Sequence, residues 1–148
     1  VRLDWKNEPQ PDILLAIQPE VGGQARIEAD GHLAGAPELI AEIAASSAAI
    51  DLHAKKEIYA RSGVLEYVVW DTLTPALHWF RLDGGDYVSV EDDQGIFRSS
   101  VFPGLWLDGV ALLRREFAKV LATLRDGLAS PEHQAFVAAQ TRKRCGEA

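Results

Sequence analysis

The alternation of apolar and polar positions predicts two strands early in the chain. Residues 38–44 read ELIAEIA, so successive side chains would face opposite sides of a sheet. This short, branched run suits a largely buried strand better than a helix. An earlier run, PDILLAI at residues 11–17, alternates in the same way and reads as a buried strand that opens with Asp12. The residues between the two runs are rich in glycine, so we expect loops and a hairpin there, and the two strands can pair.

The pattern then changes to that of a helix followed by further strands. A helix is expected from about Ala48, with Ser46 or Ser47 as its cap and Gly63 at its end. Strands are predicted after it, and tight turns between them imply an antiparallel meander. The predicted strand segments are 66–71, 76–82 and 86–92, with β character continuing over 95–107.

The C-terminal part is predicted to be helical. Residues 108–130 place apolar side chains on one stripe, which is typical of a single amphipathic helix that docks on a core. The stripe consists of Val110, Leu113, Phe117, Leu121 and Leu124. A last helix is expected over 131–144, with Ser130 as N-cap and Pro131 at its first position. The order of elements predicts one α/β (α+β) domain that spans residues 1–148.

Composition narrows the class of protein. Apolar residues make up 47% of the chain and charged residues 25%, as in ordinary globular proteins. No run approaches the roughly 18 apolar residues that a membrane span needs, so no membrane association is expected. The single cysteine, Cys145, supports neither a disulfide framework nor a thiolate metal site and fits the cytoplasm. The net charge of −7 argues against nucleic-acid binding by bulk electrostatics, although not against a local patch that uses a metal ion.

Glu42 is the most unusual residue of this pattern. A carboxylate in an apolar strand is unfavourable unless a salt bridge, a metal ion or water compensates it. Asp51, Lys55 and Tyr59 are spaced four apart on one face of the following helix, from which Lys55 could reach the strand carboxylates. Two carboxylates and an ammonium suit metal-assisted hydrolysis of a phosphodiester, in which Mg²⁺ polarises the phosphoryl group.

Structural explanations stand beside this one. Asp51 and Lys55 also fit a solvated helix pair, Asp12 fits a strand-start or turn residue, and Glu42 fits a structural ion pair. The four histidines lack metal-ligand spacing. The aromatic residues Trp79, Phe80, Phe102 and Trp106 are either ordinary core or the interface of a homodimer.

As an ordered set, these motifs resemble the Uma2 family, known as "putative restriction endonuclease", within the PD-(D/E)xK nuclease-like superfamily. The motifs are PD on a strand, E in a second strand, SS, D-x-x-x-K-x-x-x-Y, G-V-x-E-Y and a late P-G-L. The resemblance implies a restriction-endonuclease-like mixed central sheet flanked by helices, with a C-terminal helical segment. It also implies an N-terminal segment with a helix and an early acid, which we expect this chain to lack.

The resemblance implies roles for individual residues of this chain. Asp12 and Glu42 match the two family acids, which would be catalytic and would bind Mg²⁺ (or Mn²⁺). The superfamily usually has a lysine two residues after the second acid, where this chain has Ala44. In the resembled family the lysine comes from the next helix, and Lys55 matches it. The secondary candidates are Glu38, Asp51 and Lys56.

Two functions follow from this interpretation. The first is a metal-dependent endonuclease that hydrolyses phosphodiester bonds in DNA. The second is a catalytically silent nuclease-fold module for nucleic-acid or protein interaction, which is favoured by the acidic net charge, the absent short E-x-K motif and the missing early acid.

Overall fold

The computed structural model of the protein describes residues 1–3, 9–44 and 48–146, except for the side chains of residues 48–53. The chain forms two compact units, Val1–Ser89 and Val90–Ala148. That residues 1–148 act as a single domain stays a prediction. The cap expected at Ser46 or Ser47 lies outside the described residues.

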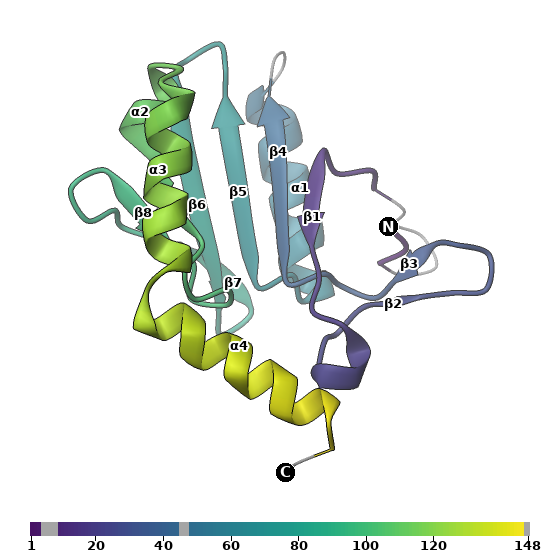
Figure 1. Ribbon diagram of the computed structural model, residues 1–148. Helices are drawn as coiled ribbons and strands as arrows, with labels where there is room; N and C mark the ends of the chain where they lie inside the picture. The colour runs from purple at the N-terminus through teal and green to yellow at the C-terminus, as the bar shows by residue number, and fades with distance from the viewer. Residues whose placement is uncertain (4–8, 45–47, 147–148) are drawn as a thin grey trace. The chain divides into compact units, whose positions relative to one another are not determined.

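The first unit is built on a five-stranded mixed sheet of order β1-β4-β5-β6-β7 (Figure 1). Strand β4 pairs antiparallel with β1 and parallel with β5, and β5, β6 and β7 form an antiparallel meander. This confirms the mixed central sheet and the pairing of the first two predicted strands. The strands are β1 (Ile13–Leu15), β4 (Leu39–Ala44), β5 (Glu66–Asp71), β6 (Ala76–Asp83) and β7 (Asp86–Ser89).

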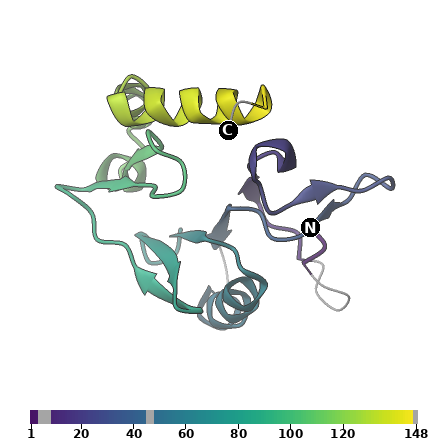
Figure 2. The same cartoon turned by 90° about the horizontal axis from the view of Figure 1, so that it is seen from below.

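Helix α1 (Ala48–Ser62) makes the parallel pairing possible. Parallel neighbours cannot be joined by a tight turn, so the chain crosses over one face of the sheet between β4 and β5 (Figure 2). The helix ends at Gly63, whose φ of 87° is a left-handed conformation that glycine adopts without strain. The predicted helix and its end are therefore confirmed.

The hydrophobic core of the first unit lies between α1 and the sheet. Tyr59 from α1 is fully buried against Tyr67 of β5, with ring centroids 5.1 Å apart in an edge-to-face arrangement. The remaining members of this cluster are Ala36, Ile40, Val64, Val69 and Phe80. Trp79 and Phe80 are both buried, which supports the core interpretation for these two residues, while a homodimer stays a prediction.

Strand β1 differs from the buried strand that its sequence predicts. It lies at the edge of the sheet, and Ile13 and Leu15 are 52% and 38% exposed. Only Leu14 packs against the core cluster. The predicted alternation of side chains is correct. A three-residue edge strand, however, packs against the core with one face only. The periodicity of the sequence does not distinguish such a strand from one that is buried on both faces.

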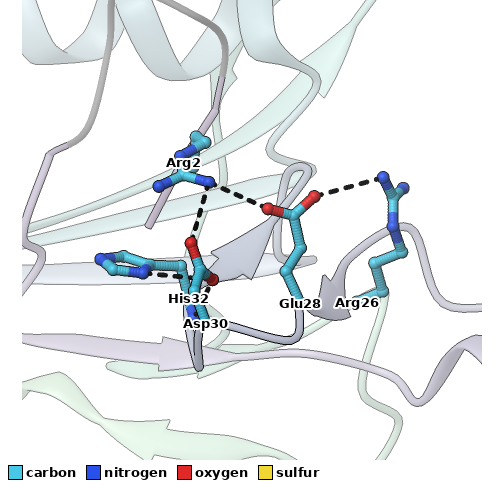
Figure 3. Close-up of polar contacts among 5 residues, drawn as sticks. All are labelled: Arg2, Arg26, Glu28, Asp30 and His32. Carbon is cyan, nitrogen blue, oxygen red and sulfur yellow. Dashed lines mark hydrogen bonds and ion pairs between the residues drawn. The ribbon is translucent and has the colours of Figure 1, made fainter.

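A small hairpin of β2 (Arg26–Ile27) and β3 (Leu33–Ala34) lies between β1 and β4 in the sequence. Arg2 bridges to Ala34, and its guanidinium lies 2.9 Å from Glu28 and 3.4 Å from Asp30 (Figure 3). The backbone N–H of His32, together with its ring and Arg2, lowers the pKa of the Asp30 carboxyl. These largely exposed ion pairs fasten the first residues to the hairpin, and each adds little stability.

The second unit holds a two-stranded sheet and three helices. Residues 95–107 do not extend the meander but supply β8 (Ile96–Arg98) and β9 (Trp106–Asp108), which pair with each other. Helix α4 (Pro131–Arg144) begins as predicted, because the Ser130 hydroxyl accepts a hydrogen bond of 3.2 Å from the backbone N–H of His133. Among the described helices, none combines the length and apolar character needed to traverse a lipid bilayer.

The prediction of a single helix over 108–130 is wrong. The structure has two helices, α2 (Gly109–Leu113) and α3 (Phe117–Leu128), separated by Arg115 with a φ of 60°. Asp108 caps α2 by accepting a 2.7 Å hydrogen bond from the backbone N–H of Ala111, and the left-handed turn at Arg115 then stops that helix.

The expected apolar stripe also does not form the buried face of this region. Val110, Phe117 and Leu121 are 42%, 53% and 52% exposed. The buried residues of α3 are Thr123 and Gly127, because the helix approaches the β9 region so closely that only a glycine fits at 127. A Cβ at Gly127 would lie 2.3 Å from the carbonyl oxygen of Gly104 and 2.8 Å from the Trp106 ring.

Gly127→Ala should therefore destabilise the protein, although alanine is the better helix former by about 1 kcal/mol. We expect the overlap to lower the free energy of unfolding by about 2 kcal/mol, as is usual for overpacked sites. Urea denaturation measures this value. Unchanged or increased stability would mean that α3 does not approach Gly104 and Trp106 as closely as the structure has it.

Candidate active site

Glu42 lies in β4 on the face that α1 covers. The residue is 8% exposed, and its neighbour on the same face, Ile40, is fully buried. Burial at this level removes most of the water that would solvate a carboxylate, so protein groups have to replace it.

Two residues of α1 supply those groups. The ammonium of Lys55 lies 3.1 Å from Oε2 of Glu42, and the hydroxyl of Tyr59 donates a 2.8 Å hydrogen bond to Oε1. Because Lys55 and Tyr59 are four residues apart, they share a helix face, as their spacing predicts. Asp51 has the same spacing, but its side chain lies outside the described residues.

The two partners of Glu42 have different surroundings. The Lys55 side chain is 36% exposed, whereas Tyr59 is completely buried. Burial, and next the hydrogen bond to Glu42, raise the pKa of the Tyr59 hydroxyl well above its ordinary value. Tyr59 therefore stays protonated, as a donor, at neutral and moderately alkaline pH.

Asp12 lies beside the strand that carries Glu42. Ile13 of β1 is paired with Ala41 of β4, and Asp12 directly precedes β1. Oδ2 of Asp12 accepts a 2.7 Å hydrogen bond from the backbone N–H of Ile43, which fixes the exposed acid at the end of the strand pair.

The donor set suits a hard divalent cation. Mg²⁺ prefers oxygen ligands and is often held by one or two carboxylates, with water and substrate phosphates completing its shell. Asp12 and Glu42 offer two such carboxylates at one end of the β1–β4 pair. Within residues 1–3, 9–44 and 48–146, no group of three or more His, Cys, Asp or Glu side chains could hold a metal. An ion at this site would therefore need water or substrate oxygens in addition to the two carboxylates.

Comparison with known protein families identifies the family of this chain. Residues 1–111 match the model of the Uma2 family, described as "putative restriction endonuclease". The chain belongs to the Uma2 family. The match contains Asp12, Glu42 and Lys55 and confirms the resemblance seen in the sequence. The curated proteins gave no match.

Glu38 of this Uma2 protein has a role in the fold. It is 2% exposed, and its two oxygens accept hydrogen bonds from the backbone N–H groups of Ile17 (2.7 Å) and Gln24 (2.9 Å). These bonds close the loop around the 3₁₀ helix η1 (Pro19–Val21). Glu38 directly precedes β4, four residues before Glu42, a separation of about 13 Å in extended chain.

Lys56, the other described secondary candidate, points away from Glu42. Its ammonium lies 3.6 Å from the centroid of the Phe80 ring, a cation–π contact, and burial lowers the pKa of the amine. It lines a cavity of about 290 Å³ together with Glu57, Ala60, Asp86 and Tyr87. The structure thus brings Lys55 to Glu42 and places Asp12 on the backbone of the next residue, Ile43, whereas Lys56 and Glu38 have other partners.

The sequence placed Tyr59 on the helix face of Asp51 and Lys55 but did not predict its bond to Glu42. The spacing that identified Lys55 could also have predicted this bond, since Tyr59 lies one helical turn further along the same face. The sequence does not reveal how deeply the Glu42 carboxylate is buried. At this burial the carboxylate needs a neutral hydrogen-bond donor as well as a cation.

The structural role of Glu38 can be tested with Glu38→Gln. An amide cannot accept both backbone hydrogen bonds without turning its NH₂ group towards one N–H, so we expect about 2 kcal/mol lower stability in urea denaturation. Glu20→Gln, an exposed change in the same loop, is the matched control and should be neutral. Equal stability of the two variants would show that Glu38 does not hold the loop.

Proposed function

We propose that this protein is a Mg²⁺- or Mn²⁺-dependent endonuclease that hydrolyses phosphodiester bonds in DNA. The observation that carries the proposal is the 3.1 Å ion pair between Lys55 of the helix and Glu42 of the strand, with Asp12 bound to the backbone of the adjacent residue, Ile43. Membership of a family described as "putative restriction endonuclease" supports the same reaction.

Asp12 and Glu42 would hold the metal ion. When bound, the ion supplies Lewis-acid polarisation of the phosphoryl group and lowers the pKa of a coordinated water. The β1–β4 pairing sets the spacing of the two acids, and the bond from Ile43 to Asp12 restrains the outer one. In the reaction a water oxygen bonds to phosphorus, one phosphorus–oxygen ester bond breaks, and the leaving oxygen gains a proton.

Lys55 would stabilise the charge that develops on the phosphoryl oxygens. Its side chain is 36% exposed, so the ammonium can turn from Glu42 towards a substrate without opening the core. A positive charge next to the developing negative charge would lower the energy of the transition state. Position 44, two residues after Glu42, is Ala44, so the cation comes from α1 rather than from the strand.

The net negative charge of the first unit implies a second role for the metal ion, in binding DNA. The acidic excess of the chain lies entirely in residues 1–89, the unit that contains Glu42. Phosphate binding rests on positive charge, so DNA affinity at this site would depend on the divalent ion.

One observation favours the alternative of a catalytically silent module. Both oxygens of Glu42 already have partners within the protein, and the described residues hold no group of three metal-binding side chains. Such a site could be a structural ion pair kept in a nuclease fold that binds nucleic acid or protein.

Nuclease assays on plasmid DNA with Mg²⁺ or Mn²⁺ separate the two functions. We expect Asp12→Asn, Glu42→Gln and Lys55→Met each to lower the cleavage rate by about 100-fold or more, because each removes a charge at the reacting phosphate. Lys56→Met is the matched control, since its ammonium lies on Phe80, and it should cleave like the wild type.

Two results would contradict the proposal. The first is a wild-type protein that cleaves with neither metal, which favours the silent module. The second is cleavage that all four variants retain, which would place the activity elsewhere or in a contaminant.

A further inference from the structure

The two oxygens of Glu42 are held by partners of opposite character. Oε1 is bound by Tyr59, which is fully buried, and Oε2 by Lys55, which is partly exposed. A buried carboxylate has several lone pairs to satisfy, and here a fixed neutral donor and a mobile cation share them.

The hydroxyl of Tyr59 has little freedom to move. The tyrosine side chain has two rotatable bonds before the ring, and the ring packs edge-to-face on Tyr67 at 5.1 Å within the core cluster. Lysine, in contrast, carries its charge at the end of a flexible four-carbon stem. When Lys55 turns towards a substrate, the bond from Tyr59 therefore remains.

We propose that Tyr59 is a positioning residue that fixes the carboxylate of Glu42 in one orientation, with Oε2 directed at the metal and at Lys55. This inference rests on the proposed function. Tyr59 touches neither substrate nor metal and acts through Glu42. Its bond occupies one of about four lone-pair sites of the carboxylate, which leaves the others for coordination.

Partners of this kind commonly decide how well a metal ligand works. Hydrogen bonds that orient a ligating side chain typically change metal affinity or activity by about 10- to 100-fold when removed.

The test compares Tyr59→Phe with Tyr87→Phe. Tyr87 belongs to the same aromatic cluster, with its ring 6.0 Å from that of Tyr67, and its hydroxyl donates a 2.8 Å hydrogen bond to the carbonyl of Val64. Each variant thus loses one hydrogen bond from a tyrosine of this cluster, but only Tyr59→Phe releases Glu42. The readouts are Mn²⁺ affinity by titration calorimetry, the ¹³Cδ chemical shift of the Glu42 carboxyl in metal-free protein, and the melting temperature.

We expect Tyr59→Phe to weaken Mn²⁺ binding by about tenfold and to shift the Glu42 carboxyl resonance. Tyr87→Phe should change neither, although both variants should melt at a lower temperature. Wild-type Mn²⁺ affinity and an unmoved resonance in Tyr59→Phe would overturn the inference. A wild-type protein that binds no Mn²⁺ contradicts the proposed function, and the carboxyl resonance of the metal-free variants then decides the positioning role alone.

Discussion

The need to compensate one buried carboxylate links the fold of this protein to its candidate chemistry. Glu42 is 8% exposed in an inner strand, so it depends on groups that the chain brings to it. The parallel pairing of β4 with β5 requires a crossover, and α1 makes that crossover on the face of Glu42. The helix that the topology demands thus also delivers the two partners of the acid. A change in the register of β4 by one residue would turn Glu42 to the other face and separate it from both.

Glu38 and Glu42 show how partners decide what a buried acid can do. Both are buried and lie four residues apart, Glu38 just before β4 and Glu42 within it. Glu38 accepts hydrogen bonds from two backbone N–H groups, and these bonds cannot break without opening the loop. Its carboxylate therefore has a structural role. Glu42 is bound by one fixed hydroxyl and one cation that can reach solvent, so one of its oxygens can change partners. Only the second arrangement suits a group that takes part in a reaction.

The sequence predicted what depends on local pattern. Strand β4, helix α1 with its glycine end, and strand β5 follow from alternation, spacing and turn residues, and the contact of Lys55 with Glu42 follows once the helix covers the strand. The exposure of β1 could not be predicted, because periodicity does not reveal an edge position. The break at Arg115 was missed, because the apolar stripe continues through it while the burial of α3 is set by the approach of Gly127 to Gly104. The partners of Glu38 lie up to 21 residues away in the sequence, beyond the reach of any local rule.

The central claim is that Asp12 and Glu42 form one cation site with Lys55 beside it. Its most direct test is a crystal of the protein soaked in Mn²⁺, with the ion located by its anomalous scattering. The account predicts one peak within bonding distance of an oxygen of each acid, with Lys55 displaced from Glu42 and the Tyr59 bond retained. A soaked crystal without a peak at Glu42, in which the Lys55–Glu42 ion pair is unchanged, would contradict it.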